Sequence, residues 1–96
     1  MKPSELMLKG YAMAGGKQCY GRYYNGDNGR TPAAVCAIGA MNLAASGNAG
    51  VVNYKRVDYR DAIELWYVKF GLSLSTFNDN CMLIEDIAGI LASEGM

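Results

Sequence analysis

Residues 31–46 read TPAAVCAIGAMNLAAS, a stretch of small and apolar side chains that contains no charged residue. Thr31 is a favourable N-cap residue, and Pro32 suits the first helical position, where its missing N–H costs nothing. This pattern predicts a helix over 33–45. Because a helix that is apolar nearly all round is a buried one, we expect it to form the centre of the fold. Gly39 and the alanines would let neighbouring helices approach it closely.

Three further helices are predicted to dock against this centre. In the middle one, Ile63, Trp66 and Phe70 recur at spacings of three and four, so their side chains share one face. The first helix begins at Pro3-Ser4-Glu5 and stops at Gly15-Gly16, the next is capped by Asp58 and ends at Gly71, and the last spans 81–93 after candidate caps at 78–80.

The segment before the central helix reads YGRYYNGDNGR at residues 20–30 and mixes aromatic and basic side chains with turn formers. Gln18–Tyr24 has the composition of a short hairpin strand, and Asn25-Gly26 is a strong turn signal. A flexible loop is the alternative. The predicted fold is therefore all-α, a compact bundle of about four helices around a central apolar helix, with a short β-hairpin at 17–30 left open.

Two remaining stretches carry weaker signals. Residues 72–77 are expected to be a connector between helices, and residues 51–54 show a short extended pattern. Neither stretch has the composition of a linker between domains. A chain of 96 residues is the usual size of one domain, so we expect a single helical domain over 1–96.

The charges of the chain balance, with nine basic and nine acidic residues. This neutrality argues against strong nucleic-acid binding, which requires several phosphates to be neutralised at once. It also leaves little repulsion between copies, so a homodimer is compatible with the sequence. The first half is basic and the second acidic, which suits head-to-tail pairing or a basic partner, although solvated faces are the simpler interpretation.

The three cysteines, Cys19, Cys36 and Cys81, are odd in number and widely spaced, unlike a disulfide framework. A free cysteine in an apolar helix, as expected for Cys36, behaves as a small hydrophobe. A reducing compartment is the simplest interpretation. No run reaches the roughly 18 apolar residues that a membrane span needs, and no signal-peptide pattern opens the chain. We therefore expect a cytoplasmic protein with no membrane partner.

The sequence contains no histidine, which removes the commonest general base and the commonest metal ligand. The scattered cysteines do not form a zinc-binding pattern. Asp58, Asp61 and Glu64 fall on one helical face and could bind a cation, but a solvated helix start is the simpler interpretation. We expect no metal, no cofactor and no catalytic site. A small enzyme that works through Asp or Cys is the remaining alternative.

The candidate binding residues lie in the loop that precedes the central helix. Neither of its glycine-rich stretches matches a phosphate-binding motif, but the expected helix N-terminus after it would attract an anion. Tyrosine rings can stack on a nucleobase, and tyrosine and arginine are also enriched at the centres of protein–protein interfaces. Tyrosines that simply pack over the bundle are the third interpretation. The candidates are Lys17, Tyr20, Arg22, Tyr23, Tyr24 and Arg30.

Two motifs, Cys36-Ala37-Ile38-Gly39-Ala40 and Phe77-Asn78-Asp79, resemble those of an uncharacterised family of small phage and bacterial proteins. That family has Cys-Ala-Leu-Gly-Ala, and usually tryptophan before the Asn-Asp pair, so the match is incomplete. The resemblance implies a phage or prophage context and a compact helical fold, and it brings no established activity. In structural terms, we expect Asp79 to cap the last helix and Asn78 to bond exposed backbone in the connector over 72–77.

These observations lead to one preferred function and two alternatives. The preferred one is a non-enzymatic, phage-derived binding protein that inhibits a host protein in the host cytoplasm, such as an anti-CRISPR-like antagonist of host defence. The first alternative is a sponge that sequesters a nucleotide signal, either a cyclic oligonucleotide or an ADP-ribose derivative. The second is the small enzyme without histidine. A protein partner and a nucleotide-like small molecule are therefore the two ligand classes.

Overall fold

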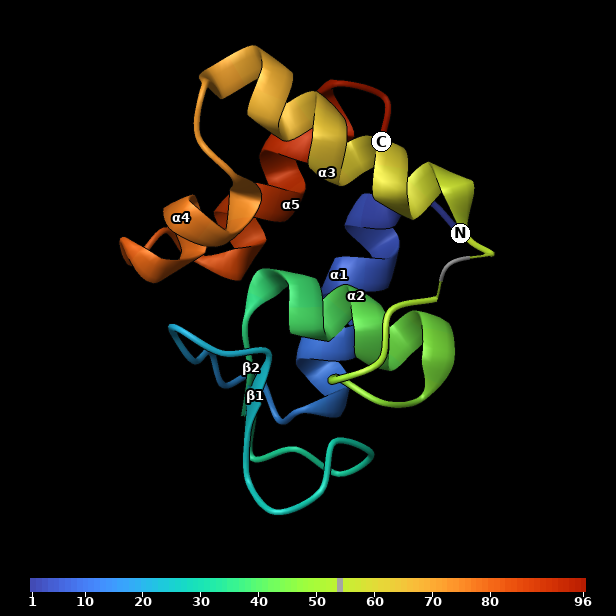
Figure 1. Ribbon diagram of the computed structural model, residues 1–96, viewed down its shortest axis with the longest axis vertical. Helices are drawn as coiled ribbons and strands as arrows, with labels where there is room; N and C mark the ends of the chain where they lie inside the picture. Colours follow the sequence, from blue (N-terminus) through green and yellow to red (C-terminus); the bar gives the residue numbers. More distant parts are fainter. Residues whose placement is uncertain (54) are drawn as a thin grey trace.

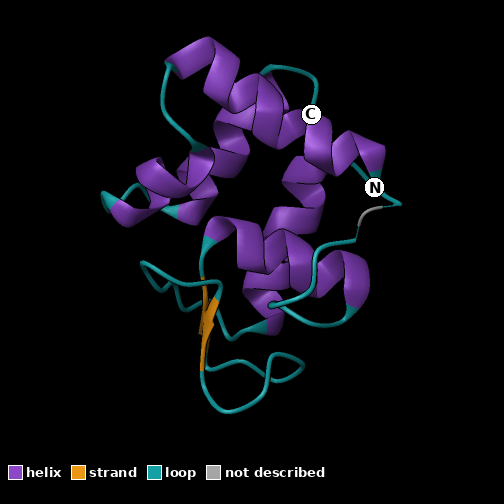
Figure 2. Cartoon of the chain, in the orientation of Figure 1, coloured by secondary structure: helices purple, strands orange, loops and turns teal. Residues whose placement is uncertain are grey.

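Helices dominate the computed structural model, which describes residues 1–53 and 55–96, and one very short sheet lies beside them (Figures 1 and 2). The all-α class and the small β-element are confirmed. Tyr54, which belongs to the extended piece expected over 51–54, lies outside the described residues. In chain order the elements are α1 Pro3–Met13, β1 Tyr24–Asn25, β2 Ala34–Val35, α2 Ala37–Ser46, α3 Val57–Phe70, α4 Leu74–Asp79 and α5 Ile84–Ser93.

Helix α2 is the centre of the fold, as its composition predicts. Every residue from Ala37 to Leu43 is buried. Helix α1 crosses it at very short range, because a Cβ built on Gly10 would lie only 1.7 Å from the carbonyl oxygen of Ala40. The backbones of α1 and α2 are therefore in direct contact, which only a residue without a side chain permits at this point.

The start of α2 differs from the prediction. The helix begins at Ala37, four residues later than expected, and Thr31 and Pro32 lie in the preceding loop. Residues 34–35 are β2 instead. Cys36 is the N-cap, and its Sγ accepts a hydrogen bond from the Gly39 N–H at 3.2 Å. The expectation that Cys36 lies inside the helix is therefore wrong.

Backbone pairing on both sides explains why residues 34–35 are extended. Strand β2 pairs antiparallel with β1, with Tyr24 opposite Val35. On its other side, the Val35 N–H donates to the carbonyl of Lys17 at 3.0 Å, and the Cys19 N–H donates to the carbonyl of Val35 at 2.9 Å. A short antiparallel pair is thus present, but its second strand lies beyond residue 30. The turn predicted at Asn25-Gly26 is wrong, because Asn25 belongs to β1.

The connector predicted at 72–77 contains a helix instead. Helix α4 is capped by Ser73, whose side chain accepts from the Thr76 N–H, and it continues to Asp79. The Asn78-Asp79-Asn80 run therefore ends α4 and does not cap the last helix. Helix α5 begins at Ile84, three residues later than predicted. The bundle accordingly has five helices in the described part of the chain, where about four were expected.

Aromatic side chains hold α3 against α4. The Trp66 ring lies 4.8 Å from the Phe70 ring and 5.3 Å from the Phe77 ring, measured between centroids. Phe70 and Phe77 are 5.7 Å apart, so the three rings form a closed cluster of tilted and edge-on contacts. Of the face predicted from Ile63, Trp66 and Phe70, Trp66 is the buried member and Phe70 remains 39% exposed.

The two chain ends lie side by side near α1 and α3 (Figure 1). Helix α1 begins at Pro3, with Lys2 at the N-cap, and the Ser4 N–H donates to the carbonyl of Met96. Ser4 is therefore inside the helix and is not its cap. Arg56, one residue before α3, takes the N-cap position predicted for Asp58 and forms an ion pair with it at 2.9 Å. No helix in the described ranges is long and apolar enough to cross a bilayer.

The backbone contact between α1 and α2 predicts opposite outcomes for two glycines. Gly10→Ala should lower the free energy of unfolding by about 1–3 kcal/mol, because the new methyl group overlaps Ala40. Gly89→Ala on α5 meets no atom within 4 Å and should raise it by up to about 1 kcal/mol. Urea unfolding of the two variants measures both values. Equal stability of the two would contradict the close crossing.

Candidate functional site

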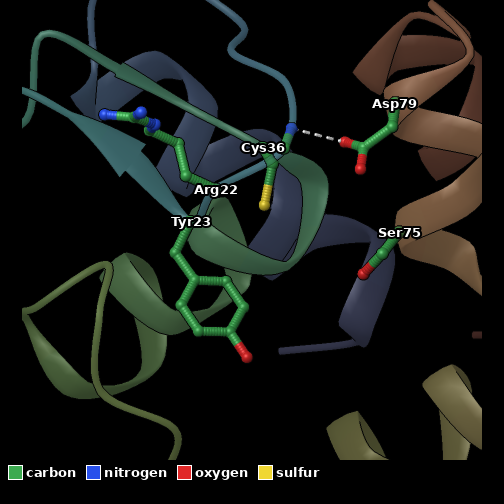
Figure 3. A pocket seen from close by; sticks show the side chains of 6 residues that line it. Arg22, Tyr23, Cys36, Ser75 and Asp79 are labelled. Atoms are coloured by element: carbon green, nitrogen blue, oxygen red, sulfur yellow. Dashed lines mark hydrogen bonds between the residues drawn. The ribbon is translucent and has the colours of Figure 1, made fainter.

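A pocket of about 380 Å³ lies between the segment Gly21–Tyr23 and helix α4 (Figure 3). Larger hollows, of about 570 and 580 Å³, lie near the chain ends and along α3. The candidate binding residues of the loop do not line them, whereas the carboxylates Asp58, Asp61 and Glu64 do. The pocket beside α4 is the place where residues from three separate parts of the chain meet. It is lined by Gly21, Arg22, Tyr23, Cys36, Ser75 and Asp79.

The side chain of Asn78, which does not itself line the pocket, connects the segments that form it. It is fully buried. Its Oδ1 accepts from the Gln18 side chain and from the Ala37 N–H, each at 2.9 Å. Its Nδ2 donates to the carbonyl of Cys19 at 3.0 Å. One amide group thus joins α4, the loop before β1 and the first turn of α2.

Gln18 extends this connection to the last helix. Its Nε2 donates to the carbonyl of Met82 at 2.8 Å, and its Oε1 accepts from the Ile84 N–H at 3.0 Å. Ile84 is the first residue of α5, whose own N-cap residue, Leu83, forms no side-chain cap. A glutamine 66 positions away therefore caps α5.

Asp79 holds the other end of the loop. Its Oδ1 accepts from the Gly21 N–H at 2.8 Å, as the dashed line in Figure 3 shows, and from the Asn78 side chain at 3.2 Å. Asp79 is exposed, so its carboxylate borders the pocket. The prediction that Asp79 caps the last helix is wrong. The prediction that Asn78 bonds exposed backbone in the connector is also wrong, because its amide bonds the buried backbone of Cys19 and Ala37 instead.

Cys36 lines the inner part of the pocket. Burial raises the pKa of its thiol, so the group is uncharged at neutral pH. Gly39, one turn later, permits the segment with Tyr23 to lie directly on the helix start, because a Cβ at Gly39 would be 1.9 Å from the carbonyl oxygen of Tyr23. That oxygen accepts from the Cys36 N–H at 3.1 Å. The close approach expected at Gly39 is therefore made by this segment and not by another helix.

The structure brings only part of the predicted site together. Arg22 and Tyr23 line the pocket, and Tyr20 is exposed on the same loop. Tyr24 is partly buried, and its ring packs near Gly29 and Gly50, away from the pocket. Neighbouring residues of an extended chain point to opposite faces, so Tyr23 and Tyr24 cannot act as one cluster. Lys17 and Arg30 are also exposed, but neither lines the pocket.

Four of the lining residues, Gly21, Cys36, Ser75 and Asp79, are not among the predicted site residues. Ser75 lies in a segment predicted to be a connector, so no sequence pattern marks it as a site residue. The sequence predicts Cys36 in the interior of a helix and Asp79 as the cap of the last helix. The Asn-Asp pair directly after an aromatic residue was the one local signal for this place, since such side chains commonly bond loop backbone.

The start of α2 offers little to an anion. The Ala37 N–H donates to Asn78, the Gly39 N–H donates to Cys36, and the Ala40 N–H donates to the carbonyl of Cys36. These donors are the groups that would otherwise bind a phosphate at a helix N-terminus. The helix N-terminus expected after Thr31 therefore lies at Ala37, where the N–H groups of Ala37 and Gly39 already have partners.

Within residues 1–53 and 55–96, no group of three or more Cys, Asp or Glu side chains is arranged to hold a metal ion. Comparisons with protein-family models, curated proteins and solved structures give no match to this chain. The resemblance to small phage proteins therefore stays a prediction.

The buried amide network predicts a large effect of one substitution. Asn78→Ala leaves the Ala37 N–H and the Cys19 carbonyl without their side-chain partner and removes one of the two acceptors of Gln18 Nε2, so it should destabilise the fold by about 3 kcal/mol or more. Asn80→Ala, at an exposed neighbouring position, should change stability by less than about 0.5 kcal/mol. Thermal unfolding followed by circular dichroism compares the two. A small effect at Asn78 would contradict its structural role.

The thiols predict a reactivity pattern that also bears on catalysis. Burial, with the nearby Cys36, raises the pKa of Cys19 to about 11, and burial raises that of Cys36, whereas Cys81 is exposed. Ellman's reagent at pH 7.5 should label one thiol per native chain quickly and three after unfolding, because only a thiolate reacts. Cys81→Ser should abolish the fast phase. A fast phase removed instead by Cys36→Ser would indicate an activated nucleophile in the pocket.

Proposed function

We propose that this chain is a small, non-enzymatic binding protein that engages a protein partner through the pocket beside α4 and its exposed rim. The observation that carries the proposal is the rim itself. Tyr20 and Tyr23 are 45% and 44% exposed on one short loop, with the exposed Arg22 between them. Tyrosine and arginine are the residue types that dominate the energetic centres of protein interfaces.

The backbone under this rim is fixed before any partner arrives. Asp79 holds the Gly21 N–H, Asn78 holds the Cys19 carbonyl, and the Cys36 N–H holds the Tyr23 carbonyl. A loop that is already ordered loses little conformational entropy on binding, so more of the contact energy contributes to affinity. This pre-organisation distinguishes the segment from an ordinary mobile surface loop.

The biological setting of the proposal rests on the sequence. The motifs at 36–40 and 77–79 resemble those of small phage proteins, so we infer a phage-encoded inhibitor of a host protein that acts in the host cytoplasm. Anti-CRISPR-like antagonism of host defence is one form of such inhibition. The absence of histidine from the chain and the raised pKa of the Cys36 thiol favour binding over catalysis.

The pocket also bears on the nucleotide alternative. A cyclic nucleotide or ADP-ribose derivative carries phosphates, and these require free donors or cations. Here the N–H groups of Ala37 and Gly39 are occupied, the Asp79 carboxylate borders the space, and the Arg22 guanidinium points away from it (Figure 3). Like charges repel, so the pocket disfavours a phosphate next to Asp79. A protein partner is therefore the better-supported ligand class.

The test compares the rim with a matched residue elsewhere. Tagged protein would be used to capture partners from a bacterial host lysate, and affinity for the captured protein would then be measured. Tyr23→Ala should weaken binding about 30-fold, the effect of losing a 2 kcal/mol hot spot, and Arg22→Ala should weaken it measurably. Tyr67→Ala, which removes a tyrosine 59% exposed on α3, should leave affinity unchanged.

Stability is measured beside affinity for every variant, because a collapsed fold would also lose the partner. Two results would overturn the proposal. One is a partner bound equally well by the Tyr23 and Arg22 variants. The other is a Tyr23→Ala protein that loses its fold, since the ring would then be part of the core.

A further inference from the structure

The pocket is lined by one acidic side chain, Asp79, and one basic side chain, Arg22. Asp79 reaches toward the loop from α4, whereas the Arg22 guanidinium points away from the pocket interior (Figure 3). No hydrogen-bond or ion-pair partner of Asp79 Oδ2 is found among the described residues. One carboxylate oxygen, bordering the pocket, is thus free to accept from a ligand.

An aromatic ring and a hydroxyl complete the lining. The Tyr23 ring lines one side of the pocket, and the Ser75 hydroxyl points into the space from α4 (Figure 3). A tyrosine ring presents its negative face to a cation within about 6 Å. A serine hydroxyl can accept a hydrogen bond from an ammonium or guanidinium group. All three groups are therefore suited to a positively charged donor.

The remaining side chain in the lining, that of Cys36, adds no charge to the pocket. The Cys36 thiol is uncharged at neutral pH, and its sulfur already accepts from the Gly39 N–H. The space of about 380 Å³ lies within the range of small-ligand pockets and accommodates a long side chain together with neighbouring backbone.

We infer that this pocket receives one basic side chain of the partner protein, with the cationic head against Asp79 and the alkyl stem along the Tyr23 ring. The inference rests on the proposed function and names the chemistry of the partner at its contact point. Arginine is preferred to lysine, because its planar guanidinium presents several N–H donors that can serve a carboxylate and a neighbouring hydroxyl together. The partner therefore presents a protruding arginine or lysine.

The first experiment needs no variant. The ¹⁵N-labelled protein is titrated with N-acetylarginine amide and with N-acetylcitrulline amide, which has nearly the same shape but no charge. The arginine probe should shift the amide signals of Gly21, Tyr23 and Ser75 in a saturable manner, with an affinity at least 10-fold higher than that of the citrulline probe. Equal effects of the two probes would overturn the inference. Larger effects of adenosine monophosphate on the same signals would also overturn it.

A charge-only variant identifies the carboxylate. Asp79→Asn retains an Oδ1 acceptor for the Gly21 N–H but removes the negative charge, and it should weaken the arginine probe about 10-fold or more. Asp61→Asn on α3, an exposed carboxylate outside this pocket, is the matched control and should bind as the unmodified protein does. An Asp79→Asn protein that folds and binds the arginine probe with full affinity would overturn the inference.

The outcomes separate this inference from the proposed function. If the captured partner is lost with Tyr23→Ala but retained at full affinity by a folded Asp79→Asn, the binding surface stands and the cation inference fails. If Asp79→Asn loses affinity for the arginine probe while the partner binds Tyr23→Ala and Arg22→Ala as tightly as the unmodified protein, the cation site stands and the proposed surface fails. If the partner is lost with Tyr23→Ala and with a folded Asp79→Asn, and the arginine probe is lost with Asp79→Asn, the surface and the cation site both stand, provided that the control variants bind normally.

Discussion

The buried side-chain amide of Asn78 is the constraint on which the rest of this structure depends. Its two ends form bonds with four groups, contributed by Gln18, Cys19, Ala37 and Asp79. A buried amide without partners would cost several kcal/mol, so the segments must come together in the one arrangement that satisfies it. The loop before β1, the start of α2 and the end of α4 are thereby fixed relative to one another. The pocket is the space left between the segments joined in this way.

Small residues provide the second condition for this arrangement. Gly10 lets α1 touch the backbone of α2, and Gly39 lets the chain at Tyr23 touch the start of α2. A side chain at either position would overlap the facing backbone and push the two segments apart. Close backbone packing and the satisfied buried amide are therefore two separate conditions for this arrangement.

Residues that looked similar in the sequence have different roles in the pocket. Tyr23 lies over the binding space, whereas the next residue, Tyr24, packs near Gly29 and Gly50. In the same way Asn78 is structural, and its neighbour Asp79 both anchors Gly21 and borders the pocket. The alternation of side chains along an extended segment, and the end of a short helix, separate these neighbours in space. A binding surface built from such pairs cannot be identified from composition alone.

Local patterns in the sequence by themselves determined the helical class, the burial of residues 37–43, and the stops at Gly15-Gly16 and Gly71. These features depend on the hydrophobic period and on backbone preferences, which a residue shares only with its near neighbours in the chain. The start of α2, the existence of α4 and the assembly of the pocket were decided by the tertiary structure. There, hydrogen bonds such as that from Gln18 to Asn78 join residues 60 positions apart, and they outweigh a local cap such as Thr31. A local signal contributes about 1 kcal/mol, and a network of buried hydrogen bonds that must all be satisfied contributes more.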